Sequence, residues 1–239
     1  MAYYRSPYSP QVGLGGRITP GVKALLIANV SVFMLQVFAL QIWGVGLEGL
    51  FGLTPAAVVQ LHFLWQPVTY MFLHSTGWLS HLLLNMLMLW MFGTEVEKGW
   101  GTRLFIKYYF ICGIGAGITT CLFNYPFYPA VTTIGASGAI FGVMLAYGLM
   151  FPNRQILFWF IFPMRAINFV LLCAGIEMFS LLSLQDGVAH LAHLGGMLFG
   201  YLYLKRVWRL KDLWSGIVWR LRRRRFRVMR PDDENYPFH

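Results

Sequence analysis

Six apolar segments divide this chain of 239 residues, and each meets or approaches the roughly 20 residues that an α-helix needs to cross a bilayer. They cover residues 22–43, 78–93, 105–123, 135–151, 166–184 and 188–204. Hydrophobic residues make up 57% of the chain and charged residues only 12%. Soluble globular domains usually contain fewer hydrophobic residues and more charged ones. The sequence therefore predicts an all-α polytopic membrane protein, a bundle of six transmembrane helices.

The lysines and arginines indicate how these segments cross the membrane. If the N-terminus lies inside, all 19 of them fall on the same side, and the three loops on the other side contain none. Cytoplasmic loops carry such an excess of positive charge. We therefore expect a polar cytoplasmic segment over residues 1–21, a six-span domain over residues 22–204 and a cytoplasmic tail over residues 205–239.

The tail mixes Trp and Leu with arginines, among them the run Arg222–Arg225. A basic amphipathic helix of this kind binds anionic lipid at the membrane surface. An arginine run can also bind nucleic acid. Because the tail follows a membrane span directly, we expect anionic lipid as its partner and no nucleic acid.

Polar side chains recur at matching depth in three of the apolar segments. His81 and Asn85 lie one turn apart in the second, Ser137 lies in the fourth, and His190 and His193 lie in the sixth. The chain runs from outside to inside in all three, so these groups can share one layer in the outer half of the bilayer. Together they supply a nucleophile, a base and donors for an oxyanion.

Other interpretations of the same residues remain open. Ser137 lies between small residues and could serve packing, while His and Asn in a span often form hydrogen bonds between helices. Several histidines can also bind a metal, but the sequence has no HExxH motif and no carboxylate beside a His pair on one helix. We therefore expect no metal and no cofactor.

Pairs of glycines accompany the polar residues. Gly138 and Gly142 are spaced four apart beside the serine, and Gly196 and Gly200 repeat that spacing in the sixth segment. Small residues let two helix backbones approach closely. Such an approach is what a hydrogen bond between Ser137 and an imidazole requires, so we interpret the serine as reactive.

These motifs resemble those of the rhomboid intramembrane serine proteases. "GASGAIFG" resembles the GxSG motif of that family, "AHLGGMLFG" its sixth-span motif and "HLLLN" its HxxxN motif. The resemblance implies that Ser137 is the nucleophile and His193 the general base. It also implies that His81, Asn85 and the backbone N–H of Ser137 stabilise the oxyanion.

Further positions match the same family. Gly135 is the first glycine of the GxSG motif, and Phe141 matches an aromatic position against which the catalytic imidazole packs. "GTEVEKGWG" resembles a cytoplasmic turn in which Glu97 and Gly101 are the matching positions. The resemblance implies an intramembrane endopeptidase of the bacterial inner membrane that opens to the outer side and cleaves single-span or polytopic membrane proteins. A catalytically silent relative that binds membrane clients is the alternative.

A carboxylate could complete the pair of Ser137 and His193, as in other serine proteases. Glu177 and Asp186 are the candidates near the outer half. Asp186 is about 10 Å from His193 along a helix, so a Ser–His dyad is expected. Glu177 is interpreted as a buried hydrogen-bonding residue or as part of a route for substrate, and His190 as a residue near the outer surface.

Overall fold

The computed structural model describes residues 16–158, 161–182 and 190–206. The chain forms two compact units, Met1–Leu202 and Tyr203–His239, and the fold is that of the first. Several predicted features fall wholly or largely outside the described residues: the polar N-terminal segment, the end of the fifth span, the start of the sixth span, Asp186 and the amphipathic tail helix.

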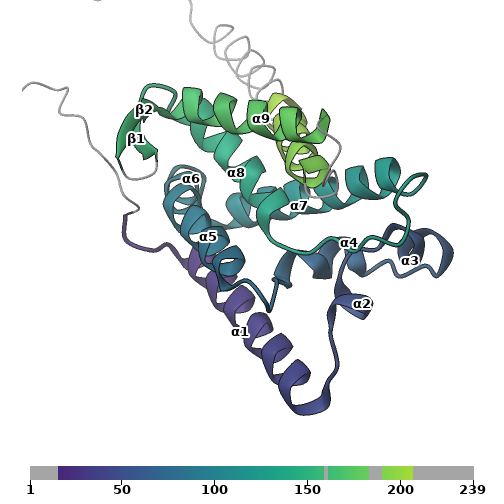
Figure 1. The fold of residues 1–239 in the computed structure, drawn as a ribbon. Coiled ribbons are helices and arrows are strands. Elements are labelled where there is room, and N and C mark those ends of the chain that lie inside the picture. Colours follow the sequence, from purple (N-terminus) through teal and green to yellow (C-terminus); the bar gives the residue numbers. More distant parts are fainter. Residues whose placement is uncertain (1–15, 159–160, 183–189, 207–239) are drawn as a thin grey trace, which may run out of the picture. The chain divides into compact units, whose positions relative to one another are not determined.

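A long apolar helix, α1 (Pro20–Trp43), begins the described fold and confirms the first predicted helix (Figure 1). Pro20 favours the start, because the first helical position needs no N–H donor. Gly44 ends the helix with a φ of 65°, a left-handed conformation that glycine adopts without strain. Short helical segments follow: α2 (Glu48–Phe51), α3 (Pro55–Gln60), α4 (Gln66–Thr69) and the 3₁₀ turn η1 (Tyr70–Phe72).

The second predicted helix is longer than its apolar stretch. It comprises α5 (Leu79–Met88), a π-helical segment (Leu89–Gly93) and α6 (Thr94–Trp100). The helix therefore ends at Trp100 rather than near residue 93, because polar residues of α6 are also buried. Gly101, with a φ of 81°, separates α6 from α7 (Thr102–Asn124), the third predicted helix.

The remaining predicted helices are α8 (Ser137–Met150), α9 (Ala166–Leu182) and residues 190–206, which are helical throughout. A small antiparallel hairpin, β1 (Gln155–Phe158) with β2 (Phe162–Arg165), joins α8 to α9. The sequence pattern indicates no regular element in that stretch. Apart from this hairpin, the all-α prediction holds.

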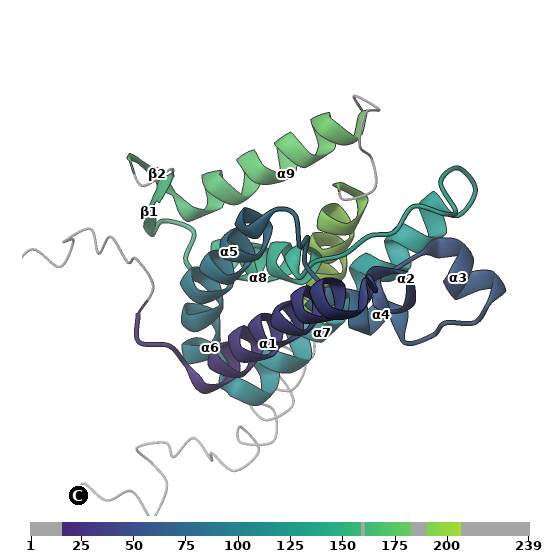
Figure 2. The ribbon, with the colours of Figure 1, turned by 60° about the horizontal axis from the view of Figure 1, so that its bottom comes forward.

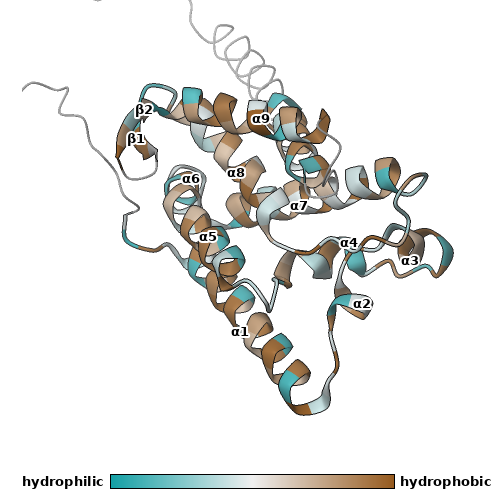
Figure 3. Cartoon of the chain, viewed as in Figure 1, coloured by the Kyte–Doolittle hydropathy of each residue, from teal (hydrophilic) through white to brown (hydrophobic). Residues whose placement is uncertain are grey.

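Length and composition qualify three helices of the described part of the chain as membrane spans: α1, the continuous run Leu79–Trp100 and α7. The helices α8 and α9 are also apolar but have only 14 and 17 residues. Large apolar side chains lie exposed along α1 and α9, which suits contact with lipid. Hydrophobic residues predominate along both helices (Figure 3). The structure is that of a polytopic helical membrane protein.

The short helix α8 occupies the middle of the unit. It contacts α5, α6, α7, α9 and the π-helical segment (Figure 1, Figure 2). Its length is about 21 Å at 1.5 Å per residue, less than the roughly 30 Å of a bilayer core. Most of its residues are buried, so α8 is enclosed by other helices over most of its surface.

The chain reaches α8 through a stretch that is bonded to other parts of the backbone. The N–H and C=O of Thr133 both pair with Leu53, each at 2.9 Å, and the N–H of Gly135 donates to the carbonyl of Tyr70 at 2.9 Å. Irregular backbone at membrane depth is tolerated only where protein satisfies its hydrogen bonds. These bonds tie the start of α8 to the segment between α1 and α5.

A buried carboxylate of α6 links three helices: α1, α6 and α7. Glu97 of α6 is only 2% exposed. It accepts hydrogen bonds from the N–H groups of Gly21 and Val22 in the first turn of α1, both at 2.8 Å, and from the hydroxyl of Thr102 in α7 at 2.6 Å. The first N–H groups of a helix have no intrahelical acceptor. Glu97 therefore caps α1 from a neighbouring helix.

We expect Glu97→Ala to lower the stability of the protein strongly. Each hydrogen bond to a charged group contributes about 1.5–3 kcal/mol, and Glu97 accepts several. Thermal unfolding of the detergent-solubilised protein measures the effect. Lys98→Ala is the matched control, because Lys98 is exposed and its ion pair with Glu95, at 2.7 Å, is a surface contact worth about 1 kcal/mol or less. Equal unfolding temperatures for the two variants would contradict this role of Glu97.

Candidate active site

Ser137 and His193 are in hydrogen-bonding contact, although they are far apart in the sequence. Ser137 is the first residue of α8, and its Oγ lies 2.7 Å from Nε2 of His193. The imidazole stacks on the ring of Phe141, with ring centroids 4.3 Å apart and planes 3° from parallel. Phe141 thus lies where the resemblance implies. Helical spacing alone could not choose between His190 and His193, and the structure brings His193 to the serine.

Glycines let the two helices meet at this point. A methyl group on Gly196 would lie 1.8 Å from the carbonyl oxygen of Gly138, and one on Gly142 would lie 2.9 Å from the carbonyl oxygen of Gly196. Both distances are shorter than a Cβ can tolerate, so α8 and the helix of residues 190–206 pack backbone against backbone. A methyl group on Gly200 would instead lie 2.5 Å from the hydroxyl oxygen of Tyr108 in α7.

His81 borders the same space as Ser137. Its Nδ1 accepts a hydrogen bond from the backbone N–H of Ser75 at 3.3 Å. A neutral imidazole has one N–H, so this contact assigns the proton to Nε2. A methyl group on Gly135 would lie 2.9 Å from that Nε2 and 3.7 Å from Ser137 Oγ. Gly135 has a φ of 123°, which favours glycine, and it keeps this space open.

Asn85 completes the group, one turn below His81 on α5. Its side chain is buried, and its Nδ2 donates one hydrogen bond to the carbonyl of His81 at 2.7 Å. The amide keeps a second N–H for another acceptor. His81, Asn85, Ser137 and His193 all line one cavity of about 360 Å³. Most other lining residues are apolar: Leu84, Met88, Ile134, Ile140, Phe141, Met144 and Ala192 among them.

The start of α8 also contributes to the cavity. Because Ser137 is the first residue of the helix, its backbone N–H has no intrahelical acceptor. The N-terminus of a helix carries a partial positive charge and favours anions. The partial positive charge at the start of α8 would therefore stabilise negative charge that develops next to Ser137.

Glu177 of α9 contacts both histidines of the sixth segment. Its Oε2 lies 2.6 Å from Nδ1 of His190 and 2.9 Å from Nδ1 of His193. The first contact is a hydrogen bond, whereas Nδ1 of His193 is close but not aligned for a regular one. The side chain is 12% exposed. Of the two sequence interpretations of Glu177, a hydrogen-bonding residue is therefore confirmed.

The sequence contained one signal for this contact. Glu177 is the only charged residue of α9, and a charge in an apolar helix is costly unless it is paired. Its partner could not be identified from spacing. His190 was expected near the outer surface, yet its side chain is only 23% exposed and bonded to Glu177.

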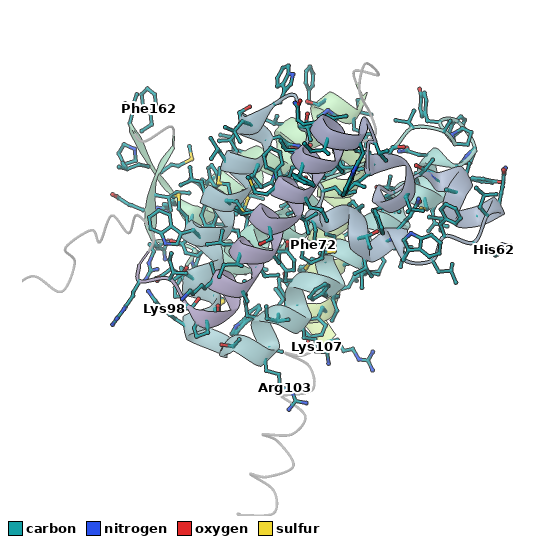
Figure 4. The ribbon with its side chains drawn as sticks, turned by 90° about the horizontal axis from the view of Figure 1, so that it is seen from below. His62, Phe72, Lys98, Arg103, Lys107 and Phe162 are labelled. Atoms are coloured by element: carbon teal, nitrogen blue, oxygen red, sulfur yellow. The ribbon has the colours of Figure 1, made fainter. Side chains whose placement is uncertain are left out.

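Two further histidines lie apart from the serine. His62 is exposed in the loop after α3, remote from the charged residues at the α6–α7 end (Figure 4). His74 is fully buried, with its ring centroid 5.1 Å from that of His81. Burial and the neighbouring His81 lower the pKa of His74 to about 4, so its imidazole is neutral near pH 7. Gln36 of α1 holds the backbone of His74 through two hydrogen bonds, at 2.9 and 3.0 Å. His74 thus supports the loop that positions His81.

Known proteins similar to this chain match the part of it that contains these site residues. Residues 62–210 match the family model described as Rhomboid domain. Rhomboid protein 1, mitochondrial, of Saccharomyces cerevisiae is 34% identical over 55% of this chain and 38% of its own length. Rhomboid protease GluP of Bacillus subtilis is 29% identical over 57% of this chain and 25% of its own length. Rhomboid protease AarA of Providencia stuartii is 28% identical over 84% of this chain and 78% of its own length.

The chain thus spans less than half the length of the yeast and Bacillus relatives. The family model nevertheless matches more than half of this chain, including α5, α7, α8, α9 and the motifs around Ser137 and His193. These matches agree with the apolar helices of the fold. The chain is an integral membrane protein and belongs to the rhomboid family.

Proposed function

We propose that this chain is an intramembrane serine endopeptidase that cleaves transmembrane segments of single-span or polytopic membrane proteins. Ser137 is the nucleophile and His193 the general base. The observation that carries the proposal is the 2.7 Å contact between Ser137 Oγ and His193 Nε2. It lies in a cavity that His81 and Asn85 also line. The apolar remainder of the lining suits a hydrophobic substrate segment.

The reaction begins when Nε2 of His193 takes the hydroxyl proton of Ser137 while Oγ attacks the substrate carbonyl carbon. Phe141 stacks on the imidazole and keeps its plane fixed. The imidazolium then gives the proton to the leaving amine as the C–N bond breaks. Water repeats both steps on the acyl-enzyme, with His193 again as the base.

The Glu177 carboxylate assists this cycle. Its Oε2 is 2.9 Å from Nδ1 of His193, where a carboxylate favours the tautomer with the proton on Nδ1 and stabilises the imidazolium. That tautomer leaves the lone pair of Nε2 directed at the serine. The Ser–His dyad expected from the sequence is thus extended by a carboxylate from α9.

The oxyanion is stabilised by three donors. They are the Nε2–H of His81, the free amide N–H of Asn85 and the backbone N–H of Ser137 at the start of α8. Preorganised donors of this kind act mainly on the transition state, and losing one costs about 2.7–4 kcal/mol.

We therefore expect His81→Ala and Asn85→Ala each to lower kcat by about 100- to 1000-fold while the protein stays folded and inserted. Steady-state cleavage of a transmembrane peptide, with thermal unfolding in parallel, measures both properties. Ser80→Ala is the matched control, because Ser80 is an exposed residue of the same helix. Full activity in the double variant of His81 and Asn85 would remove them from the mechanism.

A fluorophosphonate probe tests the proposal directly, because only an activated serine is labelled. The purified wild-type protein should be labelled once per chain and should cleave a transmembrane peptide. A folded wild-type protein that does neither would support the alternative, a silent relative that binds membrane clients.

We also propose that both termini are cytoplasmic, in a bacterial inner membrane, with the cavity opening to the outer side and the tail of residues 205–239 on anionic lipid. In support, Lys98, Arg103 and Lys107 extend outward from the α6–α7 end (Figure 4), and positive residues mark the cytoplasmic side. Reporter fusions after residues 55 and 128 should read external, and those after 100, 155 and 225 internal. A cytoplasmic reading at 128 would contradict this topology.

A further inference from the structure

Three potential metal ligands converge on the side of the His193 imidazole that faces away from Ser137. One ligand atom each of Glu177, His190 and His193 lie within 4.8 Å of one another, and Oε2 of Glu177 is 2.6 Å from Nδ1 of His190 and 2.9 Å from Nδ1 of His193. The two histidines are one turn apart on one helix, and the glutamate comes from α9. The side chains are between 12% and 23% exposed. The cluster is therefore sheltered but not closed to solvent.

The donor set suits a divalent transition metal. Two imidazoles and one carboxylate are a common ligand set of zinc, at about 2.0–2.2 Å from the ion. Ligand atoms around a tetrahedral zinc ion then lie about 3.3 Å apart. The glutamate oxygen lies 2.6 and 2.9 Å from the two nitrogens. A small retreat of the flexible Glu177 side chain would admit the ion.

The sequence predicts no metal site, because no carboxylate lies beside a His pair on one helix. In the structure the carboxylate is supplied by a different helix, which motif spacing does not detect. We propose that Glu177, His190 and His193 bind a divalent transition metal ion, with Zn²⁺ as the best fit, and that the bound ion inhibits the peptidase. The metal site stands on geometry alone, whereas the inhibition rests on the proposed function.

Inhibition follows from the position of one proton. A neutral imidazole has one N–H and one lone pair. An ion on Nδ1 of His193 uses the lone pair of that nitrogen, so the proton must lie on Nε2. The Nε2–H then donates to Ser137 Oγ, 2.7 Å away, and Nε2 can no longer accept the serine proton.

Without the ion, the tautomer is reversed. Glu177 then favours a proton on Nδ1, and Nε2 is free to act as the base. Each neutral imidazole keeps its single proton in both states, and no covalent bond to the serine forms or breaks. The metal ion and the peptidase reaction therefore compete for opposite tautomers of His193.

Titration calorimetry with ZnCl₂ on the purified full chain in detergent tests the site without any need for activity. We expect one high-affinity ion per chain. The same binding is expected for Ser137→Ala, which keeps all three ligands. Glu177→Gln and His190→Gln should each bind at least about 100-fold more weakly, since the loss of a residue that only hydrogen-bonds to a metal ligand already costs about 10- to 100-fold.

Two further variants separate a metal site from other effects. His62→Gln removes an exposed histidine outside the cluster and should leave binding unchanged. His190→Cys keeps a zinc ligand but cannot replace the imidazole hydrogen bond, and it should retain binding where His190→Gln loses it. Unchanged binding in both Glu177→Gln and His190→Gln, or a loss caused by His62→Gln, would overturn the site.

Cleavage assays test the inhibition separately. Zn²⁺ should suppress cleavage by the wild-type protein, and a chelator should restore it. For His190→Gln the readout is the ratio of its own rates with and without Zn²⁺, which should be close to one. High-affinity binding without loss of wild-type cleavage would overturn the inhibitory role. A wild-type protein that binds Zn²⁺ but never cleaves would contradict the proposed function and leave the metal site supported.

Discussion

We expect Ser137→Ala and His193→Ala each to abolish cleavage and fluorophosphonate labelling, and His190→Ala to retain substantial activity. The reason is the geometry: Nε2 of His193 is 2.7 Å from Ser137 Oγ, while Nδ1 of His190 is bonded to Glu177 at 2.6 Å. Losing a nucleophile or its base lowers kcat on the order of 10⁶-fold in a serine protease. The remaining cleavage activity would be too low to detect. Labelling and peptide cleavage, with thermal unfolding as a check on folding, measure the effect.

His190→Ala serves as the matched control for His193→Ala, since the same residue type is lost one turn away on the same helix. If His190→Ala were inactive and His193→Ala active, the general base would be His190. If both were fully active, the serine would not depend on either imidazole.

The second large effect is expected for Gly196→Ala. A methyl group there would lie 1.8 Å from the backbone carbonyl oxygen of Gly138. A carbonyl group within a helix cannot move away without distorting the helix. The two helices must separate, and His193, one turn away, moves with its helix. We expect a loss of 1–3 kcal/mol or more in unfolding free energy, roughly the cost of overpacking, together with loss of cleavage.

Gly175→Ala is the control for this change. Gly175 is also helical, in α9, and a methyl group there would meet nothing within 4 Å. Replacing such a glycine usually stabilises a helix by about 0.5–1 kcal/mol. Thermal unfolding and peptide cleavage distinguish the two variants. Wild-type activity in Gly196→Ala would show that the close approach is not required.

The sequence predicted those features that depend on neighbours along the chain. Apolar length indicated α1, α7, α8 and α9, and the glycine pairs indicated a close helix contact, which the structure has between Gly138 and Gly196. The sequence did not predict that the second helix continues through α6, because a hydropathy scale treats Glu97 as a solvent-exposed residue. The carboxylate is in fact buried by the N–H groups of α1 that it caps.

The contact of Glu177 with the two histidines could not be predicted for a different reason. Helical periodicity relates residues three or four apart on one helix, and it gives no information about the distance between two different helices. The support of His81 by His74 is hidden in the same way, because the loop between η1 and α5 folds back on itself.

The backbone bonds before α8 bear on how substitutions in this protein are interpreted. The N–H of Gly135 is held by the carbonyl of Tyr70, and Thr133 pairs with Leu53. Ser137 follows directly, so the position of its hydroxyl depends on a segment more than 60 residues earlier in the sequence. On the proposed function, substitutions around Leu53, which does not line the cavity, can thus produce proteins that fold and insert but turn substrate over slowly. A screen for inactive variants would find such residues as readily as the serine itself, because the backbone they hold sets its position.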